Sequence, residues 1–210
     1  MNLMPLAFQW KGVETILPGV VSEETVQRQL ITLHRIVTTK DKLSLTQLVK
    51  NTPNIDMTLP MRGVTALSLA LFMRHAEITR ELLGHMERLN QLSRALNVTS
   101  VDNAGRRETP LITAARTGQS EAVGMILEHK NLLNLEAIDG EGRTALWHAV
   151  REEQFNVMTM LVEAGAKVYY ERGDLSCPLQ LALKTTLLKL KASLHVQRIQ
   201  MSSLHNSYPG

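Results

Sequence analysis

An internal repeat constrains the fold of this chain more than any other feature of its sequence. Similar stretches begin at Thr65, Thr109 and Thr144, and a weaker one begins at Cys177. The spacings between these positions are 44, 35 and 33 residues. Units that recur in this way stack side by side, and each unit contacts only its neighbours. We therefore expect an array of small stacked units.

Each unit has the sequence signals of two helices joined by a turn. The threonine is a helix N-cap, because its hydroxyl accepts a hydrogen bond from a free backbone N–H of the first turn. Pro110 and Pro178 follow at the first helical position, where a missing N–H is harmless. Leucines and alanines then recur at helical spacing. Gly118 marks the turn before a second helix, and Gly165 ends the second helix of the third unit.

The pattern resembles the ankyrin repeat, which has a period of about 33 residues and the signature T-P-L-H-x-A. The resemblance rests on T-P-L-I-T-A-A from Thr109 and T-A-L-W-H-A-V from Thr144, and it covers roughly residues 57–185. It implies an all-α fold, an ankyrin-repeat solenoid of about four stacked helix-turn-helix units with helical N- and C-terminal caps. The first and last units depart from the pattern, as terminal units commonly do.

The chain is expected to divide into three parts. Residues 1–56 form an N-terminal arm and a helical cap, whose first helix begins after Ser22. Residues 57–185 hold the ankyrin repeats, and residues 186–210 form a C-terminal capping helix and a tail. The long first spacing places an insertion within residues 84–101. A helical row of leucines there either lengthens a helix over the core or offers a second contact surface.

The C-terminal segment carries the excess positive charge of the chain. It contains Lys184, Lys189, Lys191 and Arg198 and no acidic residue as far as Leu204. The net charge of +3 becomes −1 when these four residues are left out. Its leucines follow a helical spacing. The basic side of this helix is either the solvated face of a cap or a surface for a membrane or an acidic partner.

The composition excludes several classes of protein. The single cysteine, Cys177, cannot form an intrachain disulfide, which excludes a disulfide-stapled secreted scaffold. A net charge of +3 is too small to indicate nucleic-acid binding by itself. No stretch reaches the roughly 18 apolar residues of a membrane-spanning helix, and the N-terminus lacks the pattern of a cleavable signal peptide. We expect a cytoplasmic protein or, as an alternative, one secreted into a host cell without a cleavable signal.

The sequence offers no catalytic or metal-binding constellation. None of the seven histidines has a cysteine or carboxylate at metal-ligand spacing. His75 and His148 fall on or beside repeat helices, where a structural role is expected. The stretch that begins at Asp139 resembles the start of a calcium loop, but the later oxygen ligands and the final glutamate are missing. We therefore expect no enzyme activity, no metal and no cofactor.

The resemblance implies that the concave face of the array binds a partner protein. The matching positions lie in the turns between units and on the exposed side of each first helix. They are Arg62, Leu69, Phe72, Met73, Asn103, Arg106, Arg107, Glu108, Thr113, Arg116, Glu141, Arg143, Trp147, His148 and Arg151. Arginine and tryptophan are enriched among the residues that dominate protein interfaces. Phe72 and Trp147 either contribute to binding or fill space between helices.

These observations favour a non-enzymatic module for protein–protein interaction. A short, degenerate array without a signal peptide resembles bacterial effectors and toxin-neutralising proteins, and it also resembles eukaryotic adaptors. The alternative is a peripheral membrane or nucleic-acid binder that uses the basic C-terminal helix. A third option is an enzyme, or a fragment of an enzyme whose catalytic part lies elsewhere. The identity of the partner protein does not follow from the sequence.

Overall fold

The computed structural model describes residues 22–101, 105–168 and 177–185 of the chain. The elements in chain order are α1 (Glu23–Thr39), α2 (Lys42–Asn51), α3 (Ala66–Phe72), α4 (Ala76–Arg88), α5 (Leu92–Asn97), β1 (Ser100–Val101), β2 (Arg107–Glu108), α6 (Pro110–Arg116), α7 (Ser120–Leu127), the short 3-10 helix η1 (Lys130–Leu132), α8 (Ala145–Arg151) and α9 (Phe155–Ala164). A further helix follows at 178–185. The predicted all-α fold is confirmed, and its two short strands form one small hairpin.

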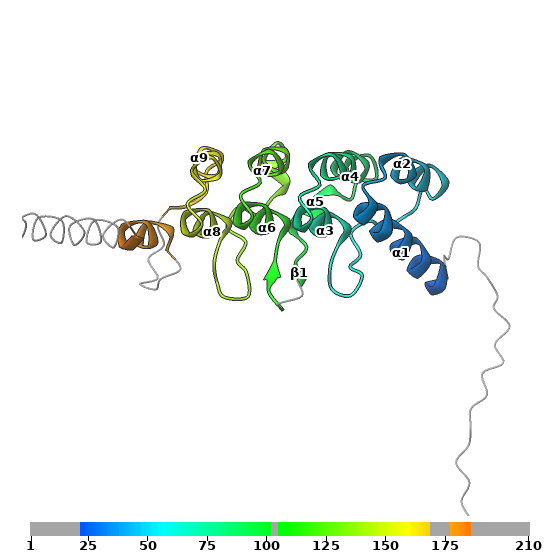
Figure 1. Ribbon diagram of the computed structural model, residues 1–210, viewed down its shortest axis with the longest axis horizontal. Coiled ribbons are helices and arrows are strands. Elements are labelled where there is room, and N and C mark those ends of the chain that lie inside the picture. Colours follow the sequence, from blue (N-terminus) through cyan, green and yellow to red (C-terminus); the bar gives the residue numbers. More distant parts are fainter. Residues whose placement is uncertain (1–21, 102–104, 169–176, 186–210) are drawn as a thin grey trace, which may run out of the picture.

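The helices of the repeats lie in two rows (Figure 1). The inner helices α3, α6 and α8 pack side by side, and so do the outer helices α4, α7 and α9. Within each unit the inner helix packs against the outer helix that follows it. Each unit therefore completes the core of its neighbour, which is the predicted solenoid.

Threonine begins each of the three inner helices, as its position in the repeat predicts. The hydroxyl oxygens of Thr65, Thr109 and Thr144 accept hydrogen bonds from the backbone N–H three residues later, at 3.2, 3.4 and 3.3 Å. Cys177 precedes the helix at 178–185 and is buried like the three threonines. All four equivalent positions are thus buried and lie directly before a helix.

Small residues allow the inner helices to approach closely. Ala70, Ala114 and Ala149 are fully buried at equivalent positions of α3, α6 and α8. Leucines such as Leu67 and Leu111 fill the space between the two rows and are at most 1% exposed. Each buried leucine contributes about 1.5–3 kcal/mol through removal of its side chain from water. The leucine and alanine periodicity of the sequence therefore marks the core correctly.

The α1–α2 pair has the geometry of a repeat unit, although the sequence repeat does not reach it. Every turn between paired helices has one residue in the left-handed region. These residues are Lys40, Arg74, Gly118 and Glu153, with φ values of 58°, 57°, 69° and 56°. Helix α1 packs against α3, and α2 packs against α4. The pair therefore covers the first repeat from the N-terminal side.

The insertion lies over the core. It lengthens α4 to Arg88 and adds α5, whose Leu92 and Leu96 are buried. Its leucine row therefore packs inward, which agrees with the first of the two sequence alternatives. Gln91, just before α5, donates to the carbonyl of Ile55 at 2.7 Å and ties the insertion to the segment before the first repeat.

Two predicted regions and one predicted site residue lie outside the described residues. They are the N-terminal arm up to residue 21, the basic helix from residue 186 onward, and Asn103. In the part of the chain that the structure describes, no helix has both the length and the apolar character needed to cross a membrane.

Candidate partner-binding face

The predicted binding residues gather on one side of the molecule, which we call the inner face. It consists of the inner helices and the loops that precede them, and it lies opposite the outer helices (Figure 1). Backbone hydrogen bonds join the three loops to one another. The N–H of Val101 donates to the carbonyl of Gly63 at 2.8 Å, and the N–H of Gly140 donates to the carbonyl of Arg107 at 3.2 Å. The loops therefore form one continuous edge.

A buried carboxylate fixes the loop of the second repeat to its inner helix. Glu108, at the end of β2, is only 1% exposed. Its two oxygens accept hydrogen bonds from the guanidinium of Arg116 at 2.8 and 3.0 Å, and one also accepts from the hydroxyl of Thr113 at 3.1 Å. Such a two-point contact between a carboxylate and arginine is short and directional. It holds Arg116 in one orientation at the end of α6.

A second buried carboxylate, that of Asp139, attaches the loop of the third repeat to its inner helix α8. Asp139 accepts backbone N–H bonds from Glu141 and Arg143 at 2.8 and 2.9 Å. Its other oxygen lies 2.8 Å from Nε2 of His148, whose ring is 3% exposed. Thr113 and His148 both lie four residues after an N-cap threonine, so the two repeats use the same attachment point on the inner helix.

The protonation states of this pair follow from their surroundings. Burial lowers the pKa of His148, although the neighbouring Asp139 carboxylate acts in the opposite direction. Burial acts to raise the pKa of Asp139, but hydrogen bonds from the Arg143 N–H, His148 and the Glu141 N–H outweigh it and lower that pKa. At neutral pH the imidazole is therefore uncharged and donates its Nε2 proton to an ionised carboxylate. This pair is a structural clamp.

Arginine side chains cover the aromatic rings of this face. The guanidinium of Arg116 lies 5.9 Å from the ring centre of Phe72. Those of Arg143 and Arg151 lie 4.4 and 5.4 Å from the ring of Trp147. Attraction between a cation and a ring holds a long side chain in place. The arginines are thus partly oriented before any partner arrives.

The predicted site residues differ widely in exposure. Arg62, Met73, Arg106, Arg107, Glu141 and Arg151 are exposed. Leu69, Phe72, Arg116 and Arg143 are half-buried. Glu108, Thr113, Trp147 and His148 are buried, with Trp147 6% exposed. The buried group can support the face but offers a partner almost no surface.

Asp139 is a supporting residue that the sequence alone did not assign to this face. In the sequence, this aspartate stands out only as the start of an incomplete calcium loop. Its partner His148 lies nine residues further along, beyond the reach of any local turn pattern. The N-cap at Thr144 could have indicated the contact, because it places the next helix directly after the turn.

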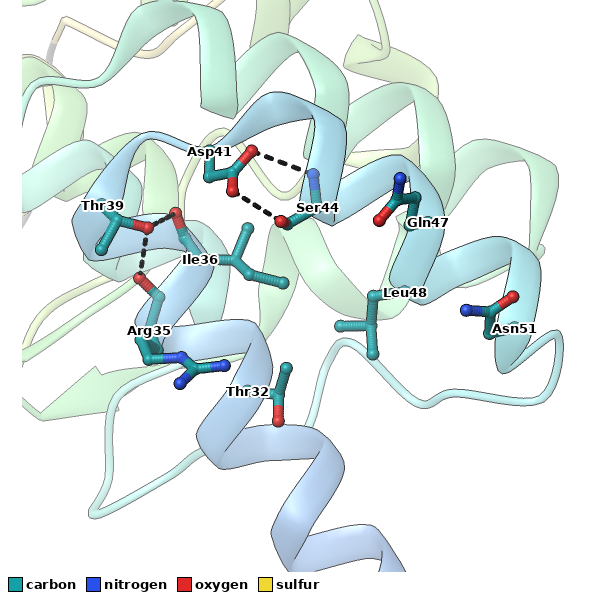
Figure 2. Close-up of a pocket in the computed structure, with 9 residues that line it drawn as sticks. All are labelled: Thr32, Arg35, Ile36, Thr39, Asp41, Ser44, Gln47, Leu48 and Asn51. Atoms are coloured by element: carbon teal, nitrogen blue, oxygen red, sulfur yellow. Dashed lines mark hydrogen bonds between the residues drawn. The ribbon is translucent and has the colours of Figure 1, made fainter.

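A hollow of about 820 Å³ lies away from the inner face, between α1 and α2 (Figure 2). Several of its polar groups bind within these two helices. Asp41 accepts from the N–H and the hydroxyl of Ser44 at 3.0 and 2.5 Å. The hydroxyl of Thr39 donates to the carbonyls of Arg35 and Ile36 at 3.0 and 3.3 Å. A polar outer side is what the terminal pair of a solenoid needs for solubility, so we assign the hollow no binding role.

The described residues also contain no cluster that could hold a metal ion, counting groups of three or more His, Cys, Asp and Glu side chains. Cys177 is buried, and its thiol contacts the carbonyl of Val168 at 3.6 Å. What the inner face offers is a surface of fixed loops and oriented cations.

Comparison with known proteins agrees with this architecture. The ankyrin repeat domain of Bcl-3, a member of the IkappaB protein family, matches this structure with a TM-score of 0.60 and 21% sequence identity. The match covers 73% of this chain and 65% of that chain. Residues 88–172 match the family described as ankyrin repeats, in three copies. Residues 88–172 are thus ankyrin repeats, and the fold of the described residues is that of an ankyrin-repeat array. Ankyrin repeats are generally protein–protein interaction modules and are typically non-enzymatic, whereas the likeness to Bcl-3 concerns the fold alone.

Proposed function

We propose that this ankyrin-repeat protein binds one partner protein through its inner face and carries out no catalysis. The observation that supports this most directly is the joining of three loops into one edge by backbone hydrogen bonds. A partner that lies along this edge meets side chains from three repeats at once. The rim arginines among them are held over aromatic rings, so fewer rotamers are lost on binding.

Affinity capture from lysates, followed by mass spectrometry, tests this proposal. The informative variant is Arg107→Glu, because Arg107 is exposed on the inner face. The matched control is Arg80→Glu, which reverses the same charge on the outer helix α4, where the side chain is 60% exposed. We expect Arg107→Glu to reduce recovery of the partner about tenfold, since the charge reversal places like charges opposite each other at the interface, which costs more than about 1 kcal/mol.

Equal recovery with the two variants would place the interface elsewhere. Catalytic turnover by the purified chain with its partner would contradict the non-enzymatic part of the proposal. Thermal unfolding of each variant, compared with the parent chain, separates a lost contact from a lost fold.

Two narrower proposals accompany the main one. We propose a role as a bacterial effector or toxin-neutralising protein, which acts in the cytoplasm of the producing cell or inside a host cell. Fractionation of producing and host cells with a tagged chain tests this. The alternative function is a membrane or nucleic-acid binder that uses the basic helix, whose residues from 186 onward lie outside the described part of the chain. Vesicle and nucleic-acid binding can be compared between the full chain and a chain that ends at Thr185. Binding that is lost in the shorter chain would support the alternative function.

A further inference from the structure

The surface of the inner face is more basic than its residue count indicates. Its loops and inner helices carry both arginines and carboxylates, and a count along the sequence almost balances them. The structure sorts the two kinds of charge by depth. The carboxylates of Glu108 and Asp139 lie inside, whereas the guanidiniums of Arg62, Arg107 and Arg151 lie at the surface. Asp102, in the loop before β2, lies outside the described residues.

The two inward carboxylates have no capacity left for a partner. Glu108 accepts three hydrogen bonds from Arg116 and Thr113, and its charge balances that of Arg116. Asp139 accepts two backbone N–H bonds and faces His148. The charge of Glu108 is thus balanced inside the protein, whereas Asp139 faces an uncharged imidazole and its charge is offset only by the N–H groups that donate to it.

The exposed charges that remain are mainly positive. Glu141 forms an ion pair with Arg143, and Glu152 lies 3.6 Å from Arg151. Arg62 and Arg107 are exposed on neighbouring loops and form no ion pair with any other described residue. An unpaired guanidinium is a planar donor that matches a carboxylate at two points. The excess of exposed positive charge therefore lies on the edge that the loops form.

The outer helices have the opposite balance, so the basic surface belongs to one side of the molecule. Their acidic residues are Glu77, Glu81, Glu87, Glu121 and Glu163, against the two arginines Arg80 and Arg88. The inner helices contain Arg116 and Arg151 and no acidic residue. A negatively charged partner is thus attracted to one face and repelled by the other.

Apolar surface beside the arginines favours a protein over a nucleic acid. Met73 is 40% exposed, and Leu69 and Phe72 are half-buried beside it. Trp147 is 6% exposed, so its ring cannot serve as a platform on which bases stack. A surface of this kind suits a peptide segment that presents both carboxylates and aliphatic side chains.

We propose that the inner face binds an acidic segment of the partner protein, whose carboxylates contact Arg62, Arg107 and the arginine pair over Trp147. Aliphatic side chains of the segment contact Met73 and Phe72. This inference rests on the proposed function, since it names the chemical class of partner for the same face.

Fluorescence anisotropy with the full chain tests this inference. The probe is a fluorescein-labelled dodecapeptide that is rich in Glu and contains leucines. The control peptide has Gln in place of every Glu. A labelled oligothymidylate of equal length serves as the nucleic-acid probe. We expect the Glu peptide to bind, with affinity that falls as salt is raised to physiological concentration. The double variant Arg62→Glu, Arg107→Glu should bind it about tenfold more weakly, and Arg80→Glu should bind it within about twofold of the parent.

Three results would overturn the inference: no binding of the Glu peptide, equal binding of the Gln peptide, or equal affinity in the double variant. Tighter binding of the oligothymidylate, lost in the same double variant, would assign the face to nucleic acid and would also overturn it. If Arg107→Glu abolishes partner capture while the Glu peptide does not bind, the proposed function stands and only the acidic partner class fails. If neither assay responds to inner-face variants, both proposals fail.

Discussion

The inner and outer helices come from the same repeats, yet they are held in place differently. Each inner helix begins with a threonine whose hydroxyl accepts an N–H of the first turn. The outer helices begin at His75, Gln119 and Gln154, none of which forms a side-chain capping bond. Two inner helices also bind a buried carboxylate from the preceding loop. Polar anchors are thus concentrated on the side that carries the predicted binding residues.

This difference separates two ways of holding a helix in the array, namely apolar packing and directional hydrogen bonds. The outer helices depend on packing of an apolar side against the inner row, which tolerates small shifts. The inner helices add hydrogen bonds that specify orientation as well as distance. A face that must present side chains from three repeats in fixed register benefits from such anchors. The predictions below compare the two rows directly.

The largest expected effect concerns the buried ion pair of the inner row. We expect Glu108→Ala to lower the free energy of unfolding by about 3 kcal/mol, because Arg116 loses its partner in a largely buried setting. Glu121→Ala is the matched change on an outer helix, where both partners of the Arg80–Glu121 pair are 60% exposed. It should cost less than about 1 kcal/mol. Urea unfolding measures both values.

Similar losses in Glu108→Ala and Glu121→Ala would show that the buried carboxylate does not anchor the second repeat. Glu108→Gln sharpens the comparison. It keeps the shape of the side chain and removes its charge, so it should fall between the parent chain and Glu108→Ala.

An intermediate effect is expected from the helix caps. Thr144→Ala removes the hydroxyl that caps α8 and should cost about 1 kcal/mol of unfolding free energy. Gln154→Ala changes the N-cap of the outer helix α9 without removing a capping bond, and it should cost less than about 0.5 kcal/mol. Thermal unfolding of the two variants in parallel provides the measurement. A greater loss in Gln154→Ala would mean that caps do not distinguish the two rows.

The smallest effect at neutral pH involves two buried histidines, one in each row. Burial lowers the pKa of His148 on α8, and burial together with Arg88 lowers the pKa of His85 on α4. In the unfolded chain these histidines bind protons at the ordinary pKa of 6.5, whereas in the folded chain they bind protons only at lower pH. Stability is therefore full above pH 6.5 and falls as the pH drops below it, by at most about 1.4 kcal/mol per pH unit and histidine.

His148→Gln and His85→Gln should each reduce this pH dependence, and the double variant should reduce it most. Unfolding free energies measured at pH values on both sides of 6.5 supply the comparison. The carboxylate of Asp139 does not interfere in this range, because its pKa is lowered: its contribution to stability is constant above its ordinary pKa of 3.8 and is lost only at lower pH. An unchanged slope in both single variants would contradict the assignment of neutral buried imidazoles.

Much of the fold could be predicted from local patterns. The threonines at 65, 109 and 144 mark the starts of the inner helices, because an N-cap acts within one turn of its own helix. The turn after each inner helix was harder to place. Gly118 indicates a left-handed residue, but Arg74 and Glu153 adopt the same conformation without being glycine. The surrounding helix packing compensates for their strain. The turn of the α1–α2 pair likewise has a non-glycine residue, Lys40, in this conformation, so the repeat-like geometry of the pair has no glycine signature in the sequence.

The sequence by itself determined the stacking of helix pairs, because periodic apolar residues have to be buried and only neighbouring units can bury them. The charge of the inner face was decided by the tertiary structure. Whether a carboxylate points inward depends on donors from other segments, such as Arg116 for Glu108 and His148 for Asp139. Residue counts contain no information on such pairings. The same arginines and glutamates that almost cancel along the sequence are separated by depth once the loops fold onto the inner helices.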